Sequence, residues 1–316
     1  MSTFGKTSTT DEVLADKNLA GAKVFVTGGN SGLGQETARA MAAKGAHVIL
    51  AGRDQAKLDA AMEAITAAHP QARLETIICD LGSLQSVRAC GNEARERFDK
   101  IDLLINNAGI MAVPKGTTAD GFESQFGTNH IGHFQLTKEL MPLIRAGTHK
   151  RIVNLSSRGH QYAPLDLDDP HFEQREYDPF VSYGGSKTAN VLFTVGLEER
   201  FGGEGIHAYA VHPGGIQTNL GRYMDEQMRD LLMSSLAKSD PDFEWKTEAQ
   251  GAATQVWAAT SDELEGRGGV YCEDCHVAEI DNESTTSGVR SYALDRASAE
   301  QLWAMSEQMI GKPFTA

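Results

Sequence analysis

The stretch Lys23-Val-Phe-Val-Thr-Gly-Gly-Asn-Ser-Gly-Leu-Gly34 decides the fold, because a short β-branched run leads directly into a glycine-rich turn. The run predicts a buried parallel strand, and the alanine-rich residues 36–44 predict a helix behind the glycines. In this setting Gly28 allows a tight turn, Gly32 allows the backbone to approach a pyrophosphate, and Gly34 allows helix and strand to pack closely. The alternative is an ordinary glycine-rich turn. Strand, turn and helix together indicate a dinucleotide-binding unit.

Apolar and helix-forming segments alternate through the rest of the chain. Further strands are predicted at 47–51, 74–79, 101–105, 151–155 and 206–211, and helices at 55–68, 84–98, 122–144 and 182–201. Parallel strands joined by helices require right-handed crossovers, which place helices on both faces of the sheet. The pattern therefore predicts an α/β fold of the Rossmann type with a doubly wound parallel sheet.

No linker rich in proline, glycine and serine divides the 316 residues. We therefore expect a polar N-terminal tail over residues 1–20 and a single domain over 21–316. Two excursions from the sheet, at about 158–180 and 219–245, are expected to carry substrate specificity. Their large apolar side chains predict a pocket for a bulky apolar carbonyl compound, and the alternative is packing on the protein itself. These side chains are Tyr162, Phe172, Tyr177, Phe180, Met224, Met228, Leu231, Leu232 and Met233.

The formal net charge of −14 argues against nucleic acid or an anionic membrane as a partner, because both would repel the chain. The first residues resemble neither a secretory signal nor a transit peptide, and no apolar run approaches the roughly 18 residues that span a bilayer. We therefore expect a cytoplasmic protein. Cys272, Cys275 and His276 suggest a metal site, but no second ligand pair accompanies them, so we expect a strand ending in a turn and no metal.

The glycine spacing Gly-x-x-x-Gly-x-Gly is similar to that of the short-chain dehydrogenase/reductase family. Further motifs occur in the family's order, namely Asp80-Leu81, Asn106-Asn-Ala-Gly109, Asn129, Ser156-Ser157, Tyr183-x-x-x-Lys187 and Pro213-Gly214. Within the family, Ala51-Gly-Arg-Asp54, Asn129-His-Ile-Gly-His-Phe134 and the long gap before Tyr183 resemble the branch of retinol dehydrogenases and the WW-domain-containing oxidoreductase. The resemblance implies an NAD(P)-dependent oxidoreductase that interconverts an alcohol and its carbonyl compound.

Four residues are expected to carry the chemistry. Tyr183 and Lys187 lie four apart on a predicted helix and share one face, so an ammonium can assist a phenol that transfers a proton. The resemblance assigns Ser157 to the hydrogen bond with the substrate oxygen. Ser156 is the rival for this role, but we expect its hydroxyl to be packed within the protein. It also assigns Asn129 to a water chain leading from Lys187, and the alternative is a helix-interior amide bonded to backbone.

The cofactor residues follow from the turn and from the resemblance. Asp80 is assigned to the adenine ring, Asn107 to the ribose next to the nicotinamide, and Thr218 to the carboxamide. The alternative role for Asp80 is to cap a helix, and the alternative role for Asn107 is to form part of a structural turn. The full expected set is Gly28, Asn30, Ser31, Gly32, Leu33, Gly34, Arg53, Asp80, Leu81, Asn107, Ala108, Gly109, Tyr183, Lys187, Pro213, Gly214 and Thr218.

The end of the second strand favours NADP over NAD. An acid there would bind the ribose 2′-hydroxyl of NAD and repel a 2′-phosphate, but the family's position for that acid is Gly52. Asp54 is then the N-cap of the next helix, and Arg53 is available for a 2′-phosphate unless it is only a solvated charge.

Several features leave alternatives open. His130 and His133 are expected to be core or capping residues rather than metal ligands, and His212 is expected to shape the turn at Pro213. The apolar C-terminal residues 298–310 are expected to dock on this or a neighbouring subunit, and a homo-oligomer is possible. The rival functions are a non-catalytic NADP-binding regulator and a sugar epimerase or dehydratase.

Overall fold

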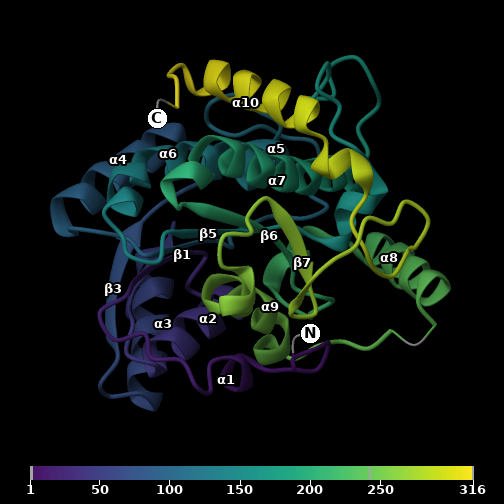
Figure 1. The fold of residues 1–316 in the computed structure, drawn as a ribbon. Helices are drawn as coiled ribbons and strands as arrows, with labels where there is room; N and C mark the ends of the chain where they lie inside the picture. The colour runs from purple at the N-terminus through teal and green to yellow at the C-terminus, as the bar shows by residue number, and fades with distance from the viewer. Residues whose placement is uncertain (1–2, 242, 315–316) are drawn as a thin grey trace.

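The central sheet contains eight strands and follows the predicted doubly wound pattern (Figure 1). The computed structural model describes residues 3–241 and 243–314. The strands are β1 (Lys23–Thr27), β2 (His47–Gly52), β3 (Arg73–Ile78), β4 (Leu103–Asn106), β5 (Arg151–Leu155), β6 (His207–His212), β7 (Val270–Glu273) and β8 (His276–Val277). Their order is β3-β2-β1-β4-β5-β6-β7-β8, and only the pairing of β7 with β8 is antiparallel.

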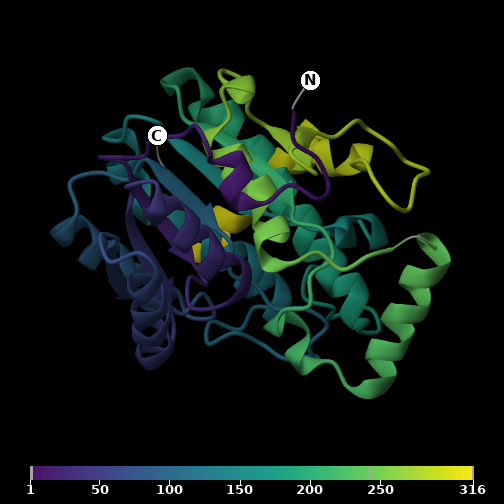
Figure 2. The same ribbon diagram turned by 90° about the horizontal axis from the view of Figure 1, so that it is seen from below.

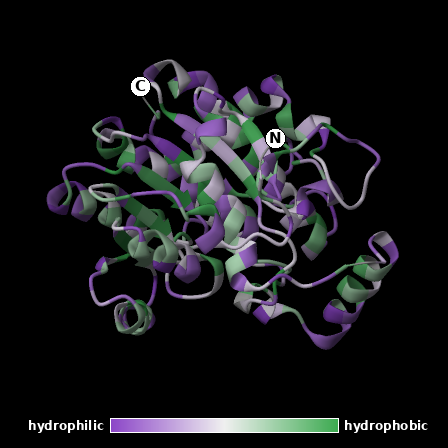
Figure 3. Cartoon of the chain, turned by 60° about the horizontal axis from the view of Figure 1, so that its bottom comes forward, coloured by the Kyte–Doolittle hydropathy of each residue, from purple (hydrophilic) through white to green (hydrophobic). Residues whose placement is uncertain are grey.

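Helices cover both faces of this sheet, as predicted (Figure 1). On one side lie α2 (Gly32–Ala43), α3 (Gln55–Ala68) and α9 (Glu248–Thr260), and on the other lie α4 (Leu84–Arg97), α6 (Gly132–Arg145) and α7 (Pro179–Phe201). The alternating side chains of β1 join the two layers, because Phe25 enters one apolar core and Val24 and Val26 enter the other. Figure 3 shows hydrophobic residues concentrated in the central strands, whereas the outer helices carry both kinds.

Three elements differ from the sequence-based expectations. The helix predicted at 122–144 is divided into α5 (Ser124–Phe126), a π-helical turn over Gly127–Ile131, and α6. The helix predicted from residue 182 begins earlier, because Pro179 occupies its first turn and Asp178 accepts hydrogen bonds from the next two backbone N–H groups. Helix α9 was not expected from its small residues, but a capping box of Thr247 and Gln250 starts it.

The segment expected to be a polar N-terminal tail packs on the domain from residue 3 onward. It forms the short helix α1 (Thr10–Val13), and Val13, Leu14 and Leu19 are buried in the core that also contains α9. Figure 2 shows this purple segment crossing that side of the molecule. Residues 1–2, 242 and 315–316 of the predicted ranges lie outside the described residues.

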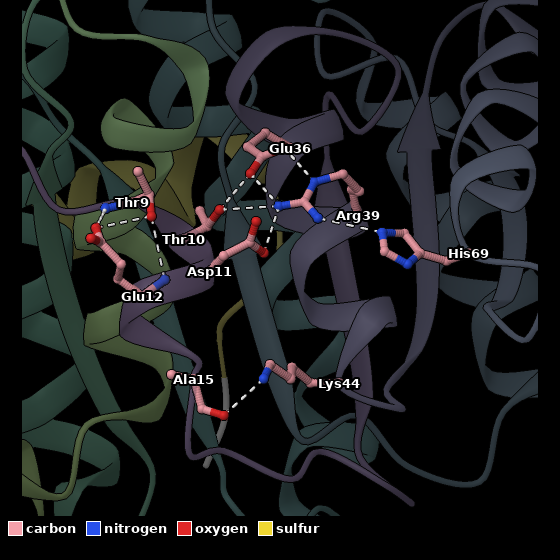
Figure 4. Close-up of polar contacts among 9 residues, drawn as sticks. All are labelled: Thr9, Thr10, Asp11, Glu12, Ala15, Glu36, Arg39, Lys44 and His69. Atoms are coloured by element: carbon pink, nitrogen blue, oxygen red, sulfur yellow. Dashed lines mark hydrogen bonds and ion pairs between the residues drawn. The ribbon is translucent and has the colours of Figure 1, made fainter.

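Polar contacts fix the same segment to α2, as Figure 4 shows. Arg39 forms an ion pair with Asp11 at 2.9 Å, and the Thr10 hydroxyl donates to Glu36. Lys44 Nζ donates to the Ala15 carbonyl oxygen at 2.9 Å. The N-terminal segment is therefore held against the helix that follows the glycine turn.

The C-terminal helix α10 (Arg296–Ile310) docks on α7 of its own chain, which answers the question that the sequence left open. Trp303 and Phe314 pack against Phe134 with ring centroids 4.9 and 5.3 Å away.

The excursion at 219–245 contains a 3₁₀ turn and α8 (Glu226–Ser239), which lies at the periphery in Figures 1 and 2. None of the helices within the described residues has the length and apolar character to cross a membrane.

Candidate active site

The glycine turn forms the start of the site. Gly28 and Gly32 have φ angles of 65° and 53°, in the left-handed region that favours glycine. A Cβ at Gly34 would lie 2.3 Å from the Gly28 carbonyl oxygen, so α2 can pack against the turn only without a side chain there. Ser31 precedes α2 without a side-chain capping bond, which leaves the first N–H groups of α2 available to an anion.

Asn107 joins the turn to the next strand of the site. Its side-chain Nδ2 donates to the Thr27 carbonyl oxygen at 2.8 Å. The Thr27 hydroxyl accepts from the backbone N–H groups of Asn107 and Ala108, at 2.9 and 3.0 Å. Asn107 is therefore part of a structural turn, which was the alternative to cofactor binding. These bonds hold Ala108 and Gly109 at the edge of the site.

A cavity of about 1480 Å³ runs along the carboxyl ends of the parallel strands. It is lined by every expected cofactor residue except Gly34, which lies behind the turn, and by Ser157, Tyr183 and Lys187. Asn129 lies behind this lining. Open parallel sheets bind ligands at this edge, so the glycine turn and the candidate catalytic residues share one ligand site.

The end of β2 lies at one side of the cavity. Gly52 is the last residue of β2, and Asp54 caps α3 by accepting from Lys57 N at 3.2 Å, as expected. Arg53 lines the cavity, and its Nη2 lies 3.4 Å from the hydroxyl of Tyr223 in the second excursion. Asp80 Oδ1 accepts from Gly82 N at 3.0 Å, which supports the turn after β3.

Tyr183 projects from α7 into the cavity and is 4% exposed. Burial raises the pKa of Tyr183 to about 12, and a hydrogen bond with Ser157 opposes that rise. Ser157 Oγ also accepts from Gly159 N at 3.0 Å. A Cβ at Gly159 would lie 2.7 Å from Tyr183 Cε1, so a glycine that no motif singled out allows the ring to take this position.

Lys187 lies one turn after Tyr183 on α7. Its Nζ donates to the Leu155 carbonyl oxygen at 2.9 Å and lies 5.7 Å from the centroid of the Tyr183 ring. Burial lowers the pKa of Lys187 to about 7. Ser156 Oγ donates to the Lys187 carbonyl oxygen at 2.9 Å, which makes Ser156 the packed hydroxyl that was expected.

Asn129 lies in the π-helical turn, a backbone form that occurs frequently at functional sites. Its amide accepts from Ile110 N at 2.9 Å and donates to the Ile110 carbonyl oxygen at 3.0 Å and to Ser186 Oγ at 2.9 Å. Asn129 therefore ties the loop after β4 to α7, the helix that carries Tyr183 and Lys187.

The comparisons with known proteins agree with this geometry. The family model for short chain dehydrogenases matches residues 22–229. The chain belongs to the short-chain dehydrogenase family. This family of oxidoreductases binds NAD(P) and acts on small molecules, and the glycine turn, with its free helix N-terminus, fits such a dinucleotide.

Similar short-chain dehydrogenases come from fungi, bacteria and animals. The chain is 42% identical to a probable oxidoreductase of Streptomyces lividans, covering 90% of this chain and 96% of that protein. It is 40% identical to short-chain dehydrogenase/reductase prx1 of Penicillium roqueforti, with 91% and 85% covered. It is 38% identical to retinol dehydrogenase 14 of Homo sapiens, with 93% and 87% covered. These relatives support the retinol dehydrogenase-like branch.

A solved structure extends the similarity to the fold. A crystal structure of an uncharacterised protein from Mycobacterium paratuberculosis has a TM-score of 0.73 and 34% identity, and the match covers 98% of this chain and all of that one. Levodione reductase, at 24% identity and a TM-score of 0.65, shows the same fold.

His130, His133 and His212 of this short-chain dehydrogenase form hydrogen bonds within the protein, and His212 also lines the cavity. Burial lowers the pKa of His133 to about 4, so the ring is neutral at pH 7. Because a carbonyl can only accept, His133 donates from Nδ1 to Asn129 O and accepts at Nε2 from the Thr27 hydroxyl, both at 2.9 Å. His130 is buried against Ser306, and His212 accepts from Arg158 N in the turn before Pro213. The described residues contain no cluster of three metal-binding side chains.

The two excursions supply the other end of the cavity. Of the apolar residues singled out in the sequence, Tyr162, Phe180, Met224, Leu232 and Met233 line it. Phe172 and Tyr177 instead pack on each other outside this lining, with centroids 5.1 Å apart, and Leu231 is 58% exposed. Leu236, Phe243 and Trp245 join the lining and were not singled out in the sequence.

Proposed function

We propose that this short-chain dehydrogenase interconverts a bulky apolar alcohol and its carbonyl compound with NADP, and that Tyr183 transfers the proton. The observation that carries the proposal is the meeting of Ser157, Tyr183 and Lys187 in the cavity that also contains the glycine turn. Cofactor binding and proton transfer would thus take place in one cavity.

When bound beside Tyr183 and Ser157, the nicotinamide would supply the hydride for reduction of the carbonyl carbon or accept it in oxidation of the alcohol. Tyr183 donates its phenolic proton to the carbonyl oxygen in reduction and accepts the alcohol proton in oxidation. A raised pKa of about 12 keeps the phenol protonated at neutral pH, which is the form that reduction requires. Ser157, which is hydrogen-bonded to Tyr183, donates to the same substrate oxygen and stabilises its developing charge.

Lys187 and Asn129 support Tyr183 from behind. The ammonium form of Lys187 favours the phenolate, so it assists the oxidation direction. Asn129 is a positioning residue, because its amide bonds to Ile110 and Ser186 hold the loop after β4 against α7. Its further role in a water chain from Lys187 belongs to the same proposal.

The preference for NADP rests on the end of β2. Gly52 leaves no carboxylate to repel a 2′-phosphate, and Arg53 lines the cavity beside it. Lys57 and Arg222 line the same cavity and add positive charge there, which Asp54 and Asp80 partly offset. A guanidinium forms paired hydrogen bonds with phosphate, which suits Arg53 to this role.

A bulky apolar substrate is supported by the lining of the excursions. Tyr162, Phe180, Met224, Phe243 and Trp245 line the same cavity as Tyr183. Flexible methionines and flat aromatic rings adapt to large apolar ligands. The names of the relatives retinol dehydrogenase 13 and 14 of Homo sapiens point to the same substrate class.

Absorbance at the reduced-nicotinamide band tests the proposal. Wild-type protein is mixed with NADPH or NADH and a panel of retinoid, steroid, aryl and small aliphatic carbonyl compounds. We expect turnover with NADPH and the large carbonyls, and its loss in Tyr183→Phe. Faster turnover of small polar ketones would overturn the substrate class. Cofactor binding without turnover of any compound would favour a non-catalytic regulator.

A further inference from the structure

Lys6 reaches the cofactor end of the cavity from outside the region that the family model matches. The model match begins at residue 22, whereas Lys6 belongs to the packed N-terminal segment. Lys6 nevertheless lines the cavity together with Ser31 and Gly32 of the glycine turn. No described residue forms an ion pair or hydrogen bond with its ammonium group.

The backbone on both sides of Lys6 is held in place. Ser8 N donates to the Gly5 carbonyl oxygen at 3.0 Å, and Gly5 N donates to Ser8 Oγ at 3.1 Å, which closes a turn around Lys6. Gln250 Nε2, in the first turn of α9, donates to the Thr7 carbonyl oxygen at 3.2 Å. Phe4 packs against the apolar core beneath. The position of Lys6 is therefore set by the fold.

The first turn of α9 also brings a negative charge to the glycine turn. Glu248 Oε1 lies 3.7 Å from the position that a Cβ on Gly32 would occupy. Residues 27–34 carry no basic side chain, so a bound pyrophosphate there would meet Glu248 with only backbone N–H groups to oppose it. A cation at this end offsets that repulsion.

Three other basic side chains of the cavity have polar partners of their own. Lys246 forms an ion pair with Asp274 at 2.6 Å beside Gly214. Lys187 donates to the Leu155 carbonyl oxygen, and Arg53 contacts the Tyr223 hydroxyl of the second excursion. Within the described residues Lys6 has no such partner, and it shares the cavity lining with the glycine turn.

We propose that Lys6 binds the pyrophosphate of the dinucleotide, so that the N-terminal segment completes the cofactor site. The inference rests on the cofactor site of the proposed function. The pyrophosphate is common to NADPH, NADH and ADP-ribose, and ADP-ribose lacks both the nicotinamide and a 2′-phosphate. Lys6 is therefore predicted to serve all three ligands equally, unlike Arg53.

Titration calorimetry on the full chain, without substrate, tests this inference. Dissociation constants for NADPH, NADH and ADP-ribose are measured for wild type, Lys6→Gln, Lys6→Arg and the control Lys17→Gln. Lys17 belongs to the same N-terminal segment but pairs with Asp262 and does not line the cavity. We expect Lys6→Gln to weaken all three ligands by about fivefold, with a smaller loss at high salt. Lys6→Arg and Lys17→Gln should bind as wild type does.

Four other outcomes overturn the inference. Unchanged affinity in Lys6→Gln would show that Lys6 does not bind the dinucleotide. A loss of affinity confined to NADPH would show that Lys6 binds the 2′-phosphate instead. An equal loss of affinity in Lys17→Gln would show that the effect comes from the overall charge of the protein. A wild type that binds none of the ligands would show that the cavity is not a dinucleotide site. A wild type that binds all three but turns over no substrate would contradict the proposed catalysis and leave the Lys6 comparison fully informative.

Discussion

Lys187 donates a hydrogen bond from Nζ to the carbonyl oxygen of Leu155, at 2.9 Å, across the gap between α7 and β5. Asn190 Nδ2 donates to the same oxygen at 2.8 Å. The carbonyl therefore keeps one donor if the lysine is removed. This arrangement holds a buried amine, whose pKa is lowered to about 7, behind the residue proposed to transfer the proton.

Lys187→Met is expected to change how stability depends on pH. The unfolded lysine keeps its proton up to its ordinary pKa of 10.5, whereas the folded one loses it near 7. The unfolded state thus binds more protons between about pH 7 and 10, and the free energy of unfolding should rise with pH there. Lys187→Met should abolish this rise and stabilise the cofactor-free protein by roughly 2–4 kcal/mol at pH 7.

Urea unfolding of the cofactor-free protein at pH 7 and 9 measures this effect. Both pH values lie below 10, where Tyr183 does not affect the comparison. Its raised pKa in the folded state makes stability fall only above the ordinary tyrosine pKa of 10.0. Equal pH slopes in wild type and Lys187→Met would show that the folded lysine keeps its ordinary pKa.

Tyr183→Phe is expected to lower kcat by about 10²–10⁴-fold, because it removes the transferable proton. The Kd for NADPH should stay within about twofold, because the ring itself remains. Tyr271→Phe is a matched control, since the buried Tyr271 hydroxyl has no hydrogen-bond partner among the described residues and does not line the cavity. Its removal should leave kcat unchanged and should not lower Tm. Steady-state rates measure kcat, and calorimetry measures the Kd and the Tm of each variant. A Tyr183→Phe protein that retains kcat would refute the proton-transfer role.

Arg53→Ala is expected to raise the Kd for NADPH by about tenfold and to leave that for NADH nearly unchanged. The reason is that only NADPH carries the phosphate that Arg53 is proposed to bind. Arg267→Ala removes an exposed arginine outside the cavity lining and serves as the control. Fluorescence titration with both cofactors measures the ratio, and an equal loss for NADH and NADPH would contradict the NADP preference.

Gly34→Ala is expected to destabilise the protein by about 1–3 kcal/mol and to weaken cofactor binding, because the new Cβ must displace the Gly28 carbonyl. Gly203→Ala is the control, since a Cβ there meets no atom within 4 Å. Thermal unfolding and NADPH titration of both variants provide the comparison. A Gly34→Ala protein with wild-type Tm and Kd would show that the turn can move away from α2.

Local patterns were sufficient to predict much of this short-chain dehydrogenase. The strand before Gly28, the helices after it and the N-cap at Asp54 each depend on residues adjacent in the chain. The prediction was wrong where the local pattern was ambiguous. Residues 122–144 appear as one apolar helix in sequence, but a π-helical turn around Asn129 interrupts it, and the bonds that reward this turn reach Ile110 and Ser186.

The sequence by itself determined the alternation of strands and helices, the order of the motifs and the placement of Tyr183 and Lys187 one turn apart, because these properties arise from near neighbours in the chain. Only the tertiary structure decided that Lys6 lines the cavity, that Gly159 leaves room for the Tyr183 ring, and that Phe172 packs on Tyr177 outside the cavity lining. Contacts of this kind depend on how loops cross the sheet edge and which surfaces pack together. Residues far apart in the chain set that packing jointly, so no single stretch of sequence encodes it.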